Sequence, residues 1–518
     1  MRELGPIGQL LQQGVSEFVV CGGARNAPLV ESISRAAEEH PEIKIWQQFD
    51  ERSAGFFALG RVNATGLPAA VVVTSGTAAA ELLPAVVEAF YQKRPLILVT
   101  ADRPESFRGT GAPQAIEQEG IYGTYAESGA WESWSRFGPF HLNLSLEEDA
   151  APETAFPDLA AFMAPSSRLV IQGLAPFLIE DIYRGLVVIV GGLEPEEREA
   201  VYHFCKDLDV PLLVDPGSGL RELLDDQVLV DGDAFLAKNP PGKVLRLGDV
   251  PLGRFWRDLE NLTEVEVLSV TRTGFAGLAR PSQTVTGSVG RVLSSMGQVE
   301  PIGDVLDLLK KNAGARFQVD DLLQAFPESE PGMIHTLSVI ATLGDSVFLG
   351  NSMPIREWSD YAQRTVPYDQ IRAMRGANGI DGQISYWLAA TADEEKSWAV
   401  LGDLTALYDV QGLAMSQQTG GQRILAVVNN GGGQIFNRLP RLASFSKGAQ
   451  DAIVQAQEVD LSALAKLWKL NYVLISSSDG FDALDELPDG TTVVELRPDQ
   501  SETEAFWTQL KVMREKRK

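Results

Sequence analysis

The chain has 518 residues, 44% hydrophobic and 22% charged, a composition that is typical of globular proteins and that argues against long disordered tails. Acidic residues outnumber basic ones by 70 to 44, and the formal charge of −26 argues against binding to nucleic acid or to an anionic membrane. Two cysteines, no signal-peptide pattern and no apolar run of membrane-spanning length predict a cytoplasmic protein without a disulfide framework or a thiolate metal site.

Short β-branched runs alternate with helix-length segments along the whole chain. This pattern predicts an α/β fold of doubly wound parallel sheets with helices on both faces. The expected strands include residues 17–21, 69–74, 95–100, 186–192, 211–215, 243–248, 346–351, 398–403, 423–429 and 491–496. Because 518 residues exceed what one hydrophobic core usually serves, we divide the chain into three α/β domains, residues 1–178, 179–328 and 329–518.

The first and third domains contain the same order of short sequence features. "VVVTSGTAAAELLPA" and "WAVLGDLTALYDVQG" are each a strand followed by small residues and a helix, which predicts two copies of one plan, although any doubly wound domain shares this pattern. The central domain opens with "VVIVGGLEPEE", which lacks the full Gly-x-Gly-x-x-Gly pattern of a dinucleotide site. The basic tail 513–518 is predicted to be a solvated helix end.

Two expected strands of the third domain end in polar side chains. Asp403 and Asn430 lie 27 positions apart and should meet at the carboxyl edge of the sheet, where ligands bind in this class of fold. A carboxylate, an amide oxygen and a backbone carbonyl suit Mg²⁺ that keeps positions open for phosphate oxygens. Helices expected after Gly402 and near Gly350–Pro354 offer unpaired N–H groups to a diphosphate. Taken alone, both polar residues are equally consistent with ordinary loops.

A third candidate, Glu51, lies in "QFDERSAGFFALG", where an extended segment meets a helix rich in Ala, Gly and Phe. A carboxyl group in such apolar surroundings has a raised pKa and can share a proton with a ring nitrogen. The alternative is an acidic residue of the first helical turn, which the helix dipole favours.

The combination of Gly-Asp and Asn-Asn resembles the cofactor signature of the thiamine-diphosphate enzymes, in which two similar α/β domains flank a third. More specifically, the chain resembles the SEPHCHC synthases of that family. The resemblance rests on "DERSAGFFALG", "VVVTSGTAAAELLPAVVEA", "LVTADRPESFRGTGAPQAIEQ", "GNSMPIRE", "RGANGIDGQIS", "GDLTALYDVQGLA" and "VVNNGGGQIFNRLP", and is loose in the central domain. It implies decarboxylation of 2-oxoglutarate and 1,4-addition of the succinyl unit to isochorismate, a step of menaquinone biosynthesis.

The resemblance also implies roles for individual residues. Glu51 would activate the aminopyrimidine ring, and Asp403, Asn430 and Gly432 would bind Mg²⁺ or Mn²⁺. Further contacts with the cofactor would come from Ser352, Ile380, Gly402, Leu404, Gln434 and Ile435. Substrate contacts would come from Arg25, Arg103, Gln114, Arg254, Ser352, Arg356, Arg375, Ile435, Phe436 and Leu439. From the sequence alone, each arginine is as consistent with the protein surface, and Ile380 and Leu439 with an ordinary core role.

In the family, the activating glutamate and the diphosphate site come from different subunits. The resemblance therefore implies a homodimer, or a tetramer built from two dimers. One segment departs from the family pattern, because Cys21–Asn26 reads "CGGARN" where Ser-Pro-Gly-Ser-Arg-Ser is usual. Arg25 is retained but the serine before it is lost, so we expect this pocket to hold a substrate acid differently.

Two rival functions remain at this point. The first is another thiamine-diphosphate-dependent 2-oxo acid decarboxylase or carboligase, and the second is a nucleotide-sensing α/β scaffold without catalysis. Many simple decarboxylases place histidines near the cofactor, whereas the four histidines of this chain lie outside the matching segments. The presence of Glu51, Asp403 and Asn430 together argues against the scaffold.

Overall fold

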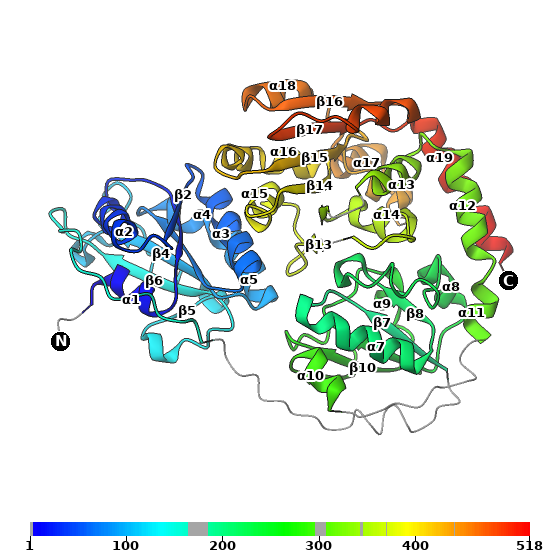
Figure 1. Cartoon of the computed structure of the whole chain (residues 1–518), viewed down its shortest axis with the longest axis horizontal. Coiled ribbons are helices and arrows are strands. Elements are labelled where there is room, and N and C mark those ends of the chain that lie inside the picture. The colour runs from blue at the N-terminus through cyan, green and yellow to red at the C-terminus, as the bar shows by residue number, and fades with distance from the viewer. Residues whose placement is uncertain are drawn as a thin grey trace.

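Three parallel sheets organise the chain into an N-terminal, a central and a C-terminal unit (Figure 1). The computed structural model describes residues 4–163, 185–295, 307–341, 345–368, 370–439 and 441–517. All strand pairings in these ranges are parallel, and the predicted fold class is confirmed. The proposed domain boundary between residues 178 and 179 lies outside the described residues. Within the described ranges, no helix combines the length and apolar character needed to cross a membrane.

The N-terminal sheet has the strand order β2-β1-β3-β4-β6-β5. Its strands are β1 (Glu17–Val20), β2 (Lys44–Gln47), β3 (Ala69–Val73), β4 (Leu96–Asp102), β5 (Glu127–Ser128) and β6 (Phe140–Ser145). Its helices are α1 (Pro6–Gln12), α2 (Ala27–Glu39), α3 (Glu51–Thr65), α4 (Thr77–Glu81) and α5 (Leu83–Gln92). Every residue of β3 and β4 is buried, because helices cover both faces, and this is why these strands are continuously apolar in sequence.

The C-terminal sheet has the order β13-β12-β14-β15-β17-β16. It contains β12 (Ser346–Leu349), β13 (Gln370–Ala373), β14 (Lys396–Gly402), β15 (Gln422–Val428), β16 (Asn471–Ile475) and β17 (Thr491–Leu496). Its helices are α13 (Glu330–Ile340), α14 (Met353–Tyr361), α15 (Gln383–Ala390), α16 (Asp403–Tyr408), α17 (Lys447–Val454), α18 (Leu461–Leu467) and α19 (Gln500–Lys516). Numbered within each unit, the strands follow the same spatial order as in the N-terminal sheet, so the predicted repeat of one plan is confirmed.

The central sheet has the order β11-β10-β9-β7-β8, formed by β7 (Leu186–Val190), β8 (Leu212–Val214), β9 (Lys243–Leu247), β10 (Glu266–Thr271) and β11 (Gln283–Thr286). The helices of this unit are α7 (Arg198–Leu208), α8 (Gly232–Lys238), α9 (Arg254–Asp258), α10 (Val289–Ser294) and α11 (Asp307–Asn312). Helix α12 (Ala315–Ala325) follows and packs along α19 of the C-terminal unit, through Leu322, Phe506 and Leu510 (Figure 1). All ten runs predicted to be strands are strands.

The N-terminal and C-terminal units are joined by close packing of α3 against α15. Gly382, at the start of α15, has a φ of +65°, and a Cβ there would lie 1.9 Å from the ring of Phe56. Asp409 is fully buried between the two helices, accepting hydrogen bonds from the Ser53 hydroxyl at 3.0 Å and the Ser385 N–H at 2.7 Å. The small residues of the "DERSAGFFALG" segment therefore serve this packing.

The basic C-terminal tail differs from expectation. Instead of ending in solvent, Arg514 and Arg517 both pair with Asp231 of the central unit, at 3.0 and 2.9 Å. Asp231 is 6% exposed, and a buried carboxylate requires such partners. The tail therefore ties α19 to the central unit.

Candidate active site

Three neighbouring strands of the C-terminal sheet end in residues predicted for the site. Ser352, Asp403 and Asn430 follow β12, β14 and β15, which are adjacent in the sheet. The register pairs Leu349 with Val400 and Gly402 with Val428, so the three strands end at nearly the same level. The strand order reverses between β12 and β14, which makes this edge the topological switch point where ligands bind in doubly wound sheets.

The Asp403 carboxylate is held against the glycine loop that follows β15. It is 2% exposed, its Oδ2 accepts from the Gly432 N–H at 2.7 Å, and its Oδ1 accepts from the Leu404 N–H at 2.6 Å. Burial raises the pKa of Asp403, and the hydrogen bonds from backbone N–H groups oppose that shift. Gly432 has a φ of +115°, and a Cβ there would lie 2.9 Å from the Val454 carbonyl oxygen, so the loop requires glycine.

The two asparagines after β15 have different surroundings. Asn429 donates to Glu495 of β17 at 2.8 Å, a structural contact between strands. Asn430 donates through Nδ2 to Glu330 Oε1 at 3.0 Å, which leaves its amide oxygen available at the strand edge beside Asp403. Burial raises the pKa of Glu330, and the charge of Asp403 adds to that shift, so Glu330 is influenced by both predicted metal-binding side chains.

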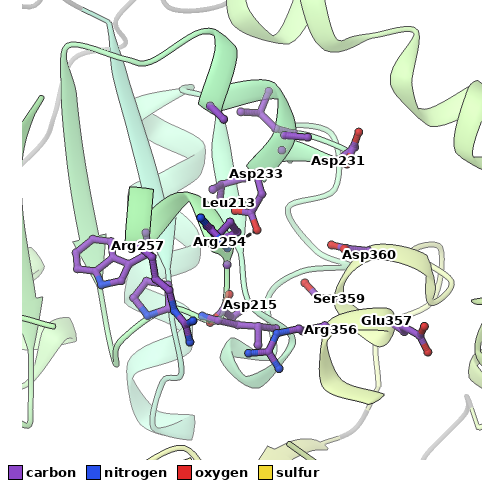
Figure 2. A pocket seen from close by; sticks show the side chains of 18 of the residues that line it. Leu213, Asp215, Asp231, Asp233, Arg254, Arg257, Arg356, Glu357, Ser359 and Asp360 are labelled. Carbon is purple, nitrogen blue, oxygen red and sulfur yellow. Dashed lines mark hydrogen bonds between the residues drawn. The ribbon is translucent and has the colours of Figure 1, made fainter. Parts of the chain in front are cut away.

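A cavity of about 620 Å³ lies between the central and C-terminal units, next to this edge (Figure 2). Five residues predicted to contact substrate line it: Arg254, Arg356, Ile435, Phe436 and Leu439. The apolar side is formed by the segment after the glycine loop, where Phe436 and Leu439 are 37% and 39% exposed. The structure thus brings apolar and cationic candidates from both units into one cavity.

Arg375, also predicted to contact substrate, is not among the residues that line this cavity. It lines a neighbouring cavity of about 510 Å³, and its Nη1 donates to Asn351 Oδ1 at 2.9 Å. Its charge also acts on Asp215, which lines the first cavity. Arg356 acts on the same carboxyl group, so the two arginines approach Asp215 from the C-terminal unit.

The remaining predicted residues surround the carboxyl edge of the N-terminal sheet. Arg25 follows β1 and donates to the Leu146 carbonyl at 3.0 Å, and Arg103 follows β4 with its guanidinium 5.1 Å from the centre of the Phe107 ring. Exposed Gln114 has a φ of +56° and lies against Gly76. Glu51 begins α3, is half-buried, and has a pKa raised mainly by burial, as the sequence predicts.

No hydrogen bond or ion pair within the described residues joins this N-terminal group to Asp403, Asn430 or the cavity side chains. The charges that raise the pKa of Glu51, besides burial, are those of Asp50 and Glu81 in the same unit. The structure of one chain therefore contains two separate sets of predicted site residues, one on each repeated sheet.

Comparison with known proteins agrees with this arrangement. Residues 7–121 match the family model described as "Thiamine pyrophosphate enzyme, N-terminal TPP binding domain". A 2-succinyl-5-enolpyruvyl-6-hydroxy-3-cyclohexene-1-carboxylate synthase from Akkermansia muciniphila is 45% identical, covering 96% of both chains. Proteins with the same name from Bdellovibrio bacteriovorus and Chloroflexus aurantiacus are 36% and 32% identical, covering 97% and 90% of this chain and 96% and 87% of theirs.

The chain belongs to the 2-succinyl-5-enolpyruvyl-6-hydroxy-3-cyclohexene-1-carboxylate synthase (SEPHCHC synthase) family. The predicted membership in the thiamine-diphosphate enzymes is thereby confirmed, and thiamine diphosphate is the cofactor that the matched domain indicates.

The residues present fit this cofactor and a divalent ion. Among the described residues, no group of three His, Cys, Asp or Glu side chains is placed to hold a metal ion. The loop instead offers one carboxylate, one amide oxygen and backbone carbonyls, a sparse oxygen set that suits an ion completing its shell with phosphate and water. Ser352, with a φ of +75° at the start of α14, and half-buried Leu404 and Gln434 lie on the same edge, while half-buried Ile380 lies just before α15.

The Cys21–Asn26 segment, which departs from the SEPHCHC synthase pattern, is held together by hydrogen bonds made by the side chain of its last residue, Asn26. Asn26 is fully buried, accepts from the Gly23 N–H at 2.8 Å and donates to the Cys21 carbonyl at 2.8 Å. Cys21 is 2% exposed, and its pKa is raised by burial first and by the charge of Glu51 second. The Cys21 side chain, which stands where the family pattern has its first serine, therefore lies next to Glu51 and not on the open surface.

Sequence reasoning missed the side chains beneath Asn430. Glu330 and Glu357 are both buried, and burial raises the pKa of each, with Glu357 raised well above its usual range. Arg438 reaches both carboxyl groups at 3.4 Å and stacks on Trp507 at 3.8 Å from the ring centre. Glu330 lies in the Glu- and Pro-rich stretch "PESEPG", beside the expected domain boundary at residues 328 and 329, so no local pattern pointed to this cluster.

Proposed function

We propose that the protein is a SEPHCHC synthase, which decarboxylates 2-oxoglutarate and adds the succinyl unit to isochorismate by 1,4-addition, in menaquinone biosynthesis in the cytoplasm. The observation that carries the proposal is that the Asp403–Asn430 edge adjoins a cavity lined by arginines as well as by apolar side chains. Full-length similarity to the Akkermansia protein supports the same activity.

The edge formed by β12, β14 and β15 would hold the cofactor. Asp403, Asn430 and the Gly432 carbonyl would bind Mg²⁺ or Mn²⁺, and the N–H groups at the start of α14, beside Ser352, would receive phosphate oxygens. When bound, thiamine diphosphate supplies the electron sink that lets a 2-oxo acid lose CO₂ and react as a nucleophile. Ile380 is the residue we assign to the contact with the thiazolium ring.

The cavity side chains have two tasks in this reaction. Ile435, Phe436 and Leu439 exclude water from the reacting carbons, which limits unwanted protonation. Arg356, together with Arg375, binds substrate carboxylates. At a separation of about 4 Å and an effective dielectric constant of about 20, the Coulomb attraction in one such contact is about 4 kcal/mol before desolvation. The net charge of −26 does not cancel this attraction, because distant charges are screened over roughly 8 Å at physiological salt.

A homodimer would complete each active site. Glu51, Arg25, Arg103 and Gln114 lie on the N-terminal sheet and have no described contact with the residues of the cavity, so we assign them to the site of a partner subunit. A tetramer of two dimers would preserve the same pairing. In this arrangement Glu51 exchanges a proton with the aminopyrimidine ring, a role for which its raised pKa is suited.

Mixed dimers test this arrangement directly. Glu51→Gln and Asp403→Asn chains, each inactive alone, should recover about one quarter of wild-type activity after random subunit exchange, because half of the dimers regain one intact site of two. Sites built within single chains would recover nothing.

The activity is tested by mixing the protein with thiamine diphosphate, Mg²⁺, 2-oxoglutarate and isochorismate and following the absorbance of isochorismate. We expect isochorismate to be consumed only when all components are present. Release of CO₂ from pyruvate but not from 2-oxoglutarate would instead identify a different thiamine-diphosphate-dependent decarboxylase. Failure of thiamine diphosphate and Mg²⁺ to stabilise the fold would contradict any such role.

A further inference from the structure

The apolar side of the cavity is carried by a short 3₁₀ helix, η8 (Gln434–Arg438), and by the residue that follows it. No residue of η8 is buried, so this wall segment, residues 435–439, has no core of its own to hold it in place. Within the described residues, the side chains of Gln434 and Asn437 bond to the glycine loop and to each other. Arg438 is the side chain that connects the wall segment to the helices beneath it.

Three contacts fix the guanidinium group of Arg438. Its Nη2 lies 3.4 Å from Glu330 Oε2, and its Nη1 lies 3.4 Å from Glu357 Oε1. Its plane lies over the Trp507 ring, 3.8 Å from the ring centre, which adds a cation–π contact. These partners come from α13, α14 and α19, so one side chain ties the wall segment to three helices of the C-terminal unit.

The charge of Arg438 is used inside the protein. Glu330 and Glu357 are 2% and 1% exposed, and a buried carboxyl pair needs a cation of this kind beside it. Figure 2 shows the Glu357 side chain pointing away from Asp215, so the pair lies apart from the arginine-lined side of the cavity. Although Arg438 borders the cavity, both ends of its guanidinium group face these buried carboxyl groups.

Glu330 uses its two oxygens for two different neighbours. Its Oε1 accepts from Asn430 Nδ2 at 3.0 Å, and its Oε2 faces Arg438. The backbone of Glu330 is held as well, because its N–H donates to the Thr503 hydroxyl at 3.0 Å. One carboxyl group on a fixed helix therefore connects the asparagine at the strand edge with the arginine that anchors the wall segment.

We propose that Arg438 is a positioning residue that, through Glu330 and Glu357, fixes the wall segment relative to Asn430. This inference rests on the proposed function, which assigns a divalent ion to Asn430 and the reacting carbons to the wall. Displacement of Arg438 should disturb both the direction of the Asn430 amide oxygen and the exclusion of water by the wall. Neither effect requires Arg438 to touch a substrate.

The test compares Arg438→Met, Arg438→Lys and the double variant Arg438→Met/Glu357→Gln as full-length proteins. Methionine keeps a long unbranched side chain beside Trp507 without the charge. The double variant removes one charge of each sign, which rebalances the buried cluster but does not restore the link to the wall segment. Arg35→Met, on exposed α2, is the matched control.

The first measurement requires no turnover. It is the Mg²⁺ concentration that gives half of the thermal stabilisation by excess thiamine diphosphate. We expect this concentration to rise about tenfold in Arg438→Met and in the double variant, the size of effect that residues behind a metal ligand usually have. Arg438→Lys should show a smaller rise, because an ammonium group keeps the charge but lacks the planar fork that reaches two carboxyl groups.

The second measurement compares the CO₂ released from 2-oxoglutarate with the isochorismate consumed. The two amounts are equal when every succinyl unit adds to isochorismate. Where water reaches the reacting carbon, the succinyl unit takes up a proton instead and leaves as an aldehyde, so CO₂ exceeds isochorismate. We expect the ratio of CO₂ to isochorismate to rise about twofold or more in Arg438→Met and in the double variant, and to stay at the wild-type value in Arg35→Met. A loss of stability alone would not change this ratio.

An unchanged Mg²⁺ requirement in Arg438→Met would overturn the inference, and so would an unchanged ratio. If the double variant regains wild-type behaviour in both measurements, Arg438 only neutralises charge and the inference is also wrong. Should Arg438→Met fail to fold, the double variant decides. If the wild type consumes no isochorismate, the proposed function fails and the Mg²⁺ requirement alone decides the inference. A wild type without Mg²⁺-dependent stabilisation would refute both.

Discussion

Asp409 lies between the two repeated units and forms hydrogen bonds to both. Because its pKa lies within the pH range of an unfolding experiment, replacing it gives a quantitative test of the fold. The carboxylate is completely buried and accepts hydrogen bonds from the Ser385 N–H, the Ser385 hydroxyl and the Ser53 hydroxyl. Burial raises its pKa from 3.8 to about 6, and the three hydrogen bonds oppose the shift only in part. Asp409→Asn keeps the shape and an acceptor for the N–H, while both hydroxyls can turn to accept from the new amide.

The sign and size of the effect follow from proton linkage. Between pH 3.8 and about 6 the folded protein holds a proton that the unfolded chain releases. The stabilising contribution of this group is therefore complete below about pH 4 and is lost as the pH rises through 6. A difference of this size between the two pKa values corresponds to at most about 3 kcal/mol, and the asparagine variant does not titrate.

The assay is urea unfolding of cofactor-free wild type and Asp409→Asn at fixed ionic strength between pH 4 and 8. We expect similar stability near pH 4 and an advantage for the variant that grows to about 3 kcal/mol at most by pH 8. Asp451→Asn, which changes an exposed carboxylate on α17, is the control and should show no such trend. A constant difference between wild type and Asp409→Asn across this range would refute the reasoning.

Three further changes test separate parts of the structure. Glu51→Gln should lower turnover by about 100-fold or more, while the protein keeps its melting temperature and its stabilisation by thiamine diphosphate with Mg²⁺; near-normal turnover would contradict the proton-transfer role. Asp403→Asn should abolish the part of that stabilisation that EDTA removes, measured by thermal melting, and an undiminished EDTA effect would place the metal elsewhere. Gly382→Ala should cost about 2–5 kcal/mol in urea unfolding, because it combines a left-handed backbone with overlap on Phe56; a loss below 1 kcal/mol would show that α3 and α15 are not packed as closely as described.

Nine of the ten strands recovered from sequence lie in the interior of their sheets; β8, at an edge, was also recovered, and the buried interior strand β10 was missed. β3, β4, β7, β14 and β15 read as continuous apolar runs because helices cover them, and the sequence pattern reports that burial directly. The strands that were not identified include β5, β11, β13 and β16, which lie at the edges of their sheets and carry partly exposed, mixed residues. Edge strands are specified by their single neighbour more than by a local pattern.

The candidate site shows a similar contrast between residues that a local sequence pattern marks and residues that only tertiary packing brings together. Asp403 and Asn430 could be predicted because each stands in a local pattern of strand, turn and glycine, and adjacency of the strands brings the two together. Glu330 could not, since it lies 100 residues from Asn430 and meets it only through packing of α13 against the sheet.

The buried carboxyl pair explains why an amide and not a carboxylate stands at position 430. Asn430 donates to Glu330, which already lies beside Glu357 and Asp403, and Arg438 is the one cation that both glutamates reach among the described residues. An aspartate at position 430 would offer no N–H to Glu330 and would add a further negative charge next to two buried carboxyl groups. The asparagine instead supplies a neutral oxygen on one side and a donor on the other. The polarity of residue 430 is thus dictated by the side chains beneath it as much as by any ion above it.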